Sequence, residues 1–65
     1  MGATAATTSA EALLRVCADI ASQLVQAHDE GRPVSLNAVR GAACTRHRYG
    51  GVPRLTDIIA AIPDA

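Results

Sequence analysis

The apolar residues between positions 8 and 30 recur at steps of three and four. This stripe consists of Leu13, Val16, Cys17, Ile20, Leu24 and Ala27, widened by Ala21 and Val25. The polar positions are Arg15, Asp19, Ser22, Gln23, Gln26, Asp29 and Glu30. Steps of three and four place side chains on one face of an α-helix, so the pattern predicts a long amphipathic helix over residues 8–30.

Both ends of this predicted helix have suitable capping residues. Thr8 and Glu11 have the spacing of a capping box, in which the two side chains satisfy backbone N–H groups at the helix start. Gly31 suits the position after a helix, and Pro33 prevents continuation. We therefore expect a turn at 31–34.

Two shorter helices are predicted after this turn. Ser35 is a favourable N-cap for the first, whose apolar side consists of Leu36, Val39 and Ala43. Gly41 is expected to interrupt this helix, which should fray before Tyr49.

The last helix should contain Pro53 in its first turn and stop at Pro63. Its predicted apolar face consists of Leu55, Ile58, Ile59 and Ile62. The pattern thus predicts an all-α fold of about three short helices in residues 9–65, after a disordered tail at 1–8. Because the core is thin, Ile58 or Ile62 could instead cover a partner or a downstream domain.

Composition limits the function of such a chain. Of 65 residues, 49% are hydrophobic, but Tyr49 is the only aromatic residue and many of the others are alanine, which buries little area. So small a core barely offsets the entropy of ordering the chain. We therefore do not expect a self-contained enzyme with a deep, dry pocket. The pattern contains no targeting or membrane-spanning segment, so the expected compartment is cytosolic.

The two cysteines and two histidines form no recognisable site in the sequence. Cys17 and Cys44 are expected to be free core thiols, with a single disulfide as the alternative. Together with His28 and His47 they lack the close paired spacing of zinc ligands, so no metal is expected. No catalytic motif is present, and His28 is interpreted as a boundary residue at a helix end.

One stretch does suggest binding. Every ionised side chain from position 40 to 54 is positive, and the acids lie outside the stretch in the sequence. The candidate RNA-binding residues are Arg40, Arg46, His47, Arg48 and Arg54. Guanidinium groups bind phosphates, and the neighbouring Tyr49 could stack on a base. The alternative is a solvated helix end, because cations also stabilise a helix C-terminus.

The residues from position 13 to 64 closely resemble the extreme N-terminal region of the catalytic subunit of the eukaryotic Elongator complex. The resemblance rests on Cys-Ala-Asp-Ile at 17–20, Leu-Asn at 36–37, the basic stretch ending at Tyr49, and above all Pro-Arg-Leu-Thr-Asp-Ile-Ile at 53–59 with Ile-Pro-Asp at 62–64. The tail before this region has no counterpart that we can place.

The resemblance implies a role in tRNA modification. Proteins of that family join a radical-SAM domain to an acetyltransferase domain, use a 4Fe-4S cluster, S-adenosylmethionine and acetyl-CoA, and modify the wobble uridine of tRNA. Their N-terminal region helps to bind tRNA, which makes the five basic residues expected tRNA backbone contacts, Arg54 above all. This chain contains neither catalytic domain, so we expect no cofactor in it and no activity from it alone.

A second hypothesis is a protein-interaction module. In that case the apolar helix faces would pack on the rest of the subunit or on another Elongator subunit. A third, an independent helical protein, requires an accidental match. The expected partners are therefore tRNA and other Elongator subunits, with neither DNA nor a membrane. The expected location is the cytoplasm, with the nucleus as a second compartment.

Overall fold

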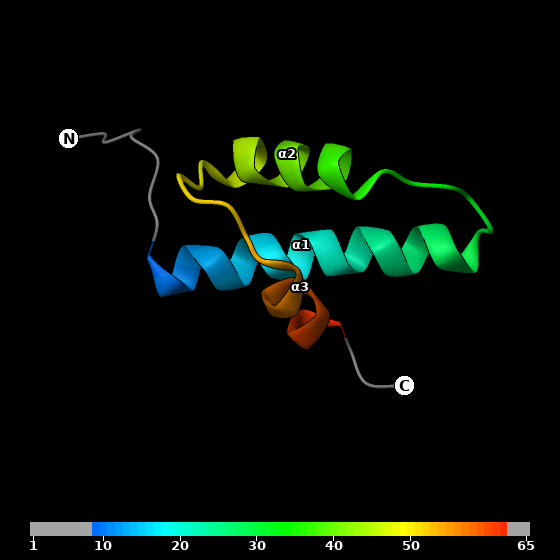
Figure 1. The fold of residues 1–65 in the computed structure, drawn as a ribbon, viewed down its shortest axis with the longest axis horizontal. Coiled ribbons are helices and arrows are strands. Elements are labelled where there is room, and N and C mark those ends of the chain that lie inside the picture. The colour runs from blue at the N-terminus through cyan, green and yellow to red at the C-terminus, as the bar shows by residue number, and fades with distance from the viewer. Residues whose placement is uncertain (1–8, 63–65) are drawn as a thin grey trace.

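The computed structural model describes residues 9–62, and these residues form three helices (Figure 1). They are α1 (Ala10–Asp29), α2 (Leu36–His47) and α3 (Leu55–Ala61). The predicted all-α fold is confirmed. The predicted disordered tail at 1–8 and the stop at Pro63 lie outside the described residues. No helix in the described range is long and apolar enough to cross a membrane.

Helix α1 begins later than the sequence pattern suggested. Ser9 is its N-cap, and the Ser9 hydroxyl accepts a hydrogen bond from the Ala12 N–H at 3.2 Å. Thr8 of the predicted capping box lies outside the described residues, and Glu11 pairs with Arg15 at 3.0 Å. A serine caps as well as a threonine, so the spacing alone did not separate the two starts.

The end of α1 follows the prediction. Gly31 has a φ of +65°, a conformation that glycine adopts without a steric penalty. The Gly31 N–H donates to the His28 carbonyl at 3.1 Å, and the Arg32 N–H donates to the Ala27 carbonyl at 2.8 Å. These bonds satisfy carbonyl groups that the last turn leaves unpaired, and they turn the chain toward α2.

Helix α2 ends before Tyr49 as predicted, but Gly41 does not interrupt it. Ser35 caps it as predicted, accepting from the Ala38 N–H at 3.3 Å, but the helix continues through Gly41 to His47. Gly41 lies on the exposed side with no other residue close to where a Cβ would stand. The only cost of Gly41 is therefore its low helix propensity, about 1 kcal/mol relative to alanine. The packing of the rest of α2 outweighs this cost. Arg48 ends the helix in the left-handed conformation, with a φ of 54°.

Helix α3 also differs from the prediction at its start. Pro53 is not in its first turn; it lies before the helix with a fully buried side chain, and Arg54 is the N-cap residue. The buried ring thus fills part of the core rather than starting the helix. The helix that follows has seven residues.

The three helices share one small core, with α2 and α3 on different sides of α1 (Figure 1). Its buried side chains are Val16, Cys17 and Ile20 from α1, Val39 and Ala43 from α2, and Ile58 from α3. Of the predicted α1 stripe, Leu13 and Leu24 are only half-buried at its edge.

The predicted apolar face of α3 is wrong in three of its four positions. Ile58 is fully buried, but Leu55, Ile59 and Ile62 are 52%, 56% and 37% exposed. Helix α3 inserts Ile58 into the core and packs Ala61 at the edge of the core, whereas Leu55 and Ile59 face outward. Ile58 therefore belongs to the core and is not available to a partner, whereas Ile62 is.

Candidate nucleic-acid interface

The five basic residues singled out in the sequence lie on two elements. Arg40, Arg46 and His47 are in α2, Arg48 ends that helix, and Arg54 precedes the first residue of α3. Since α2 begins at a serine cap and runs to His47, three of the five fall in or directly after its last turn. Cations at this end also complement the negative end of the helix dipole.

The structure adds an acidic residue to this group. Asp19, from the middle of α1, accepts a hydrogen bond from Arg46 Nη1 through its Oδ2 atom. His47 Nε2 lies 3.0 Å from the same oxygen, and Gln23 Nε2 donates to Oδ1 at 3.0 Å. The expectation that the acids lie outside the basic stretch therefore holds along the chain but not in space.

Sequence reasoning missed Asp19 because no local signal marks it. It was assigned to the polar face of α1, yet its side chain is only 19% exposed because it faces the last turn of α2. The contact joins residues 27 and 28 positions apart. Only the antiparallel packing of α1 and α2 brings these side chains together.

The environment of Asp19 alters its pKa. Partial burial by itself raises the pKa of this carboxyl, but hydrogen bonds from Gln23, His47 and Arg46, with the charge of Arg46, together lower the pKa below its ordinary value. Asp19 is therefore ionised at neutral pH, and its charge offsets part of the positive charge at this end of α2.

The remaining basic residues have different surroundings. Arg40 Nη2 donates to Asn37 Oδ1 at 2.7 Å, and Arg40 Nη1 donates to the Pro53 carbonyl at 3.4 Å, so Arg40 links α2 to the segment before α3. Arg48 and Arg54 are exposed. The Arg54 side chain makes no hydrogen bond or ion pair with another residue in the range 9–62.

Tyr49 is not an open stacking platform. Its half-buried ring packs against the core, and its Cε2 and hydroxyl oxygen lie against Gly51. Any added Cβ at Gly51 would stand 3.0 Å from both atoms. One side of the Tyr49 ring is therefore already covered by the α2–α3 connection.

The cysteines are free, as expected. Cys17 is buried, and burial together with the nearby Asp57 and Cys44 raises the pKa of its thiol. Cys44 is half-buried, with Sγ 3.9 Å from the Gly51 carbonyl oxygen. No group of three His, Cys, Asp or Glu side chains within residues 9–62 is placed to hold a metal ion. His28 lies at the end of α1 with its side chain 90% exposed.

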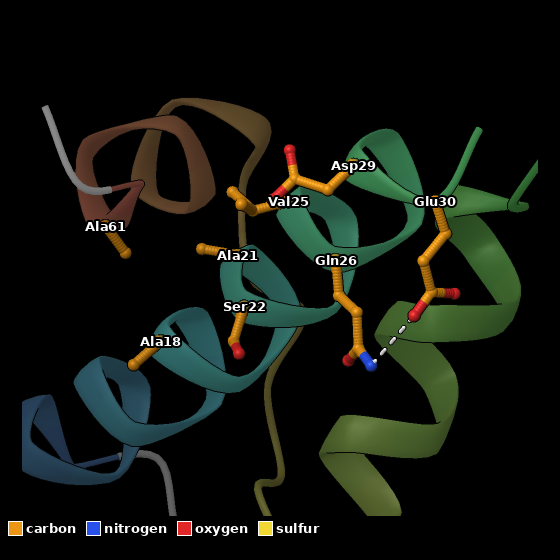
Figure 2. Close-up of a pocket in the computed structure, with 8 residues that line it drawn as sticks. All are labelled: Ala18, Ala21, Ser22, Val25, Gln26, Asp29, Glu30 and Ala61. Carbon is orange, nitrogen blue, oxygen red and sulfur yellow. Dashed lines mark hydrogen bonds between the residues drawn. The ribbon is translucent and has the colours of Figure 1, made fainter. Parts of the chain in front are cut away.

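A shallow groove of about 480 Å³ lies between the second half of α1 and the end of α3 (Figure 2). Its apolar lining is Ala18, Ala21, Val25 and Ala61, and its polar lining is Ser22, Gln26, Asp29 and Glu30. Gln26 donates to Glu30 at 3.2 Å, as Figure 2 shows, and Arg32 donates to the same carboxylate at 3.0 Å. These bonds lower the pKa of Glu30. The lining offers no nucleophile–base pair, so the groove shows no catalytic arrangement.

Comparison with known proteins gives one consistent result. A family model described as the ELP3 N-terminal domain matches residues 13–65. Elongator complex protein 3 of Danio rerio is 43% identical over 54 residues, which are 83% of this chain and 10% of that protein. The human protein of the same name is 37% identical over the same length, and that of Schizosaccharomyces pombe is 40% identical over 58 residues, 86% of this chain and 11% of that protein.

The present chain thus spans about a tenth of the length of these curated relatives. No solved structure gives a significant match.

Proposed function

Because this chain belongs to the ELP3 N-terminal domain family, we propose that it is a tRNA-docking segment of an Elongator-type tRNA-modifying enzyme and has no catalytic activity by itself. The resemblance found in the sequence is confirmed at the level of the family, and the chain is an Elongator-related segment. Docking of tRNA is the finer step that the proposal adds.

One observation carries the proposal. The end of α2 presents Arg48 on the surface beside the partly exposed Arg46, and Arg54 before α3 is exposed as well. Guanidinium groups in this setting suit contacts to RNA phosphates, which position a nucleic acid without reading its sequence. We therefore expect affinity that depends strongly on salt and weakly on RNA sequence.

The test compares two double variants with equal loss of charge. Arg48→Ala/Arg54→Ala removes two cations from the candidate interface. Arg15→Ala/Arg32→Ala removes two exposed cations from elsewhere, whose side chains are 64% and 51% exposed. We expect only the first pair to weaken binding of an unmodified tRNA and to flatten the salt dependence of log K by about 0.7–0.9 per lost phosphate contact. Equal effects of the two pairs would exclude this interface.

A triple variant, in which alanine replaces Arg46, Arg48 and Arg54, gives a second test. If tRNA affinity and its salt slope are unchanged in that triple variant, the basic end of α2 does not bind tRNA. Circular dichroism of each variant checks that the helices are retained.

The exposed residues of α3 favour a second candidate function, which is docking to protein. Leu55 and Ile59 on this seven-residue helix and Ile62 directly after it place three large apolar side chains at the surface. The partner would be the rest of an Elongator subunit 3 chain or another Elongator subunit. Apolar docking persists when salt is added, whereas phosphate binding weakens steeply.

A paired substitution tests the docking candidate. Ile59→Ser should reduce binding to purified Elongator subunits at low and high salt alike, because it removes apolar contact area. Val34→Ser, at a residue 40% exposed and outside α3, is the control. If Ile59→Ser leaves binding unchanged, α3 is not the contact surface.

The cofactors expected for the full-length family are assigned by this proposal to regions outside residues 1–65. Cys17 and Cys44 do not fit an iron–sulfur site, because Cys17 is buried and residues 9–62 supply no third cysteine near the two thiols. Location in the cytoplasm, with the nucleus as a second compartment, is proposed with the function.

A further inference from the structure

The contact between Asp19 and the end of α2 has the form of an occupied anion site. We infer that Arg46 and His47 form a phosphate-binding site that Asp19 masks, so that an RNA phosphate reaches these two residues only by displacing the Asp19 carboxylate. This inference rests on the proposed function for its RNA ligand and on the geometry for its site.

The geometry resembles the binding of a phosphate oxygen. A single atom, Asp19 Oδ2, faces both the Arg46 guanidinium and the His47 imidazole. Carboxylate and phosphate are the two anions that an arginine side chain binds best, and each takes the same N–H donors. Asp19 Oδ2 therefore occupies the position at which a phosphate oxygen would meet both side chains.

The site is at the surface and therefore reachable. The Arg46 side chain is 53% exposed and the His47 side chain 30%, whereas Asp19 beneath them is 19% exposed. An incoming phosphate would meet the Asp19 charge at the same position, and like charges repel. Asp19 could alternatively hold Arg46 in position for RNA, and that alternative predicts the opposite sign for the experiment below.

The first measurement is the affinity of the 65-residue chain for an unmodified tRNA. Asp19→Asn removes the masking charge while keeping a side chain of the same shape. Glu30→Gln changes the net charge equally and releases Arg32 at the C-terminal cap of α1, away from Asp19. We expect Asp19→Asn to bind about three- to tenfold more tightly at low salt, as one or two further charge-assisted contacts form. Affinity no higher than that of Glu30→Gln would overturn the inference.

A variant without charge change removes the general electrostatic explanation. Gln23→Ala deletes the hydrogen bond that holds Asp19 Oδ1 and leaves the net charge as it was. A smaller gain of about twofold is expected, because Asp19 is loosened rather than removed. Adding Arg46→Ala to Asp19→Asn should abolish most of the gain. If the gain persists without Arg46, the site is not where we place it.

Titration with inorganic phosphate separates this inference from the tRNA proposal. Magnetic resonance signals of Arg46 Nε and the His47 ring should shift with phosphate in Asp19→Asn and much less in the parent chain. Such shifts without tRNA binding would uphold the masked site and reject the proposed function. Binding of tRNA by the parent chain, with no phosphate-induced shift in Asp19→Asn, would support the proposed function and reject the masked site.

Discussion

Asp19 shows how one side chain determines the charge of a surface. Its carboxylate draws hydrogen bonds from Gln23 on its own helix and from Arg46 and His47 on the next. The contact has a structural consequence besides its effect on ligands, because it ties the last turn of α2 to the middle of α1. A partly buried, hydrogen-bonded pair of this kind contributes more than an exposed ion pair.

The pH dependence of stability should reveal this tie. The folded pKa of Asp19 lies below its ordinary value. Its contribution is therefore full above the unfolded pKa of about 3.9 and is lost as the pH falls through the folded value. We expect urea unfolding midpoints at neutral and acid pH to differ more for the parent chain than for Asp19→Asn. At neutral pH the variant should lose about 1 kcal/mol. Identical pH profiles would show that Asp19 gives no pH-linked stability.

At the scale of the elements, the ends of the helices are fixed by a few local residues. The hydroxyls of Ser9 and Ser35 each accept a hydrogen bond from the backbone N–H three residues later in the chain. Gly31 turns the chain after α1. These features act over a few positions. They explain why the existence and order of the helices could be predicted without knowledge of their packing.

Two glycines allow a matched test of this view. Gly31→Ala places a side chain at a φ of +65° and should cost about 1 kcal/mol, although no atom obstructs the added Cβ. Gly41→Ala lies within α2, also in open space, and should stabilise the chain by about 0.5–1 kcal/mol. Chemical denaturation followed by circular dichroism measures both. The same sign for the two substitutions would contradict the assigned conformations.

The sequence could not predict features that depend on distant contacts. The position of Pro53 in the core and the exposure of Leu55, Ile59 and Ile62 follow from the way α3 crosses α1, which periodicity does not encode. The candidate RNA-binding residues could be selected by charge. Their different surroundings could not be predicted from charge. Asp19 holds one group, Arg40 links α2 to the segment before α3, and Arg48 and Arg54 are exposed.

At the scale of the whole molecule, α1 supports both of the other helices, and α3 depends on very few large side chains. Ile58 is fully buried and joins Ile20 and Val39 in one core. For a chain of 65 residues the total free energy of unfolding is about 3–10 kcal/mol. Loss of a single core contact can therefore remove a large part of it.

Two isoleucines in α3 test this dependence. Ile58→Ala should destabilise the chain by about 2–5 kcal/mol, because it deletes fully buried methyl and methylene groups. Ile59→Ala makes the same chemical change at a residue that is 56% exposed, and it should have little effect. Urea midpoints of the two variants give the comparison. A similar loss for both would mean that α3 does not dock through Ile58.

Because α1 contacts both other helices, we expect parts of the molecule to unfold locally in a defined sequence. Ile20 shares the core with Val39 of α2 and Ile58 of α3, so amide protons near it should exchange with solvent deuterium only when the whole chain unfolds. Those of the seven-residue α3 can exchange when that helix alone detaches from Ile20. Helix α3 would then be the first to separate, and a partner that binds its exposed Ile59 would slow exchange there before it slows exchange anywhere else.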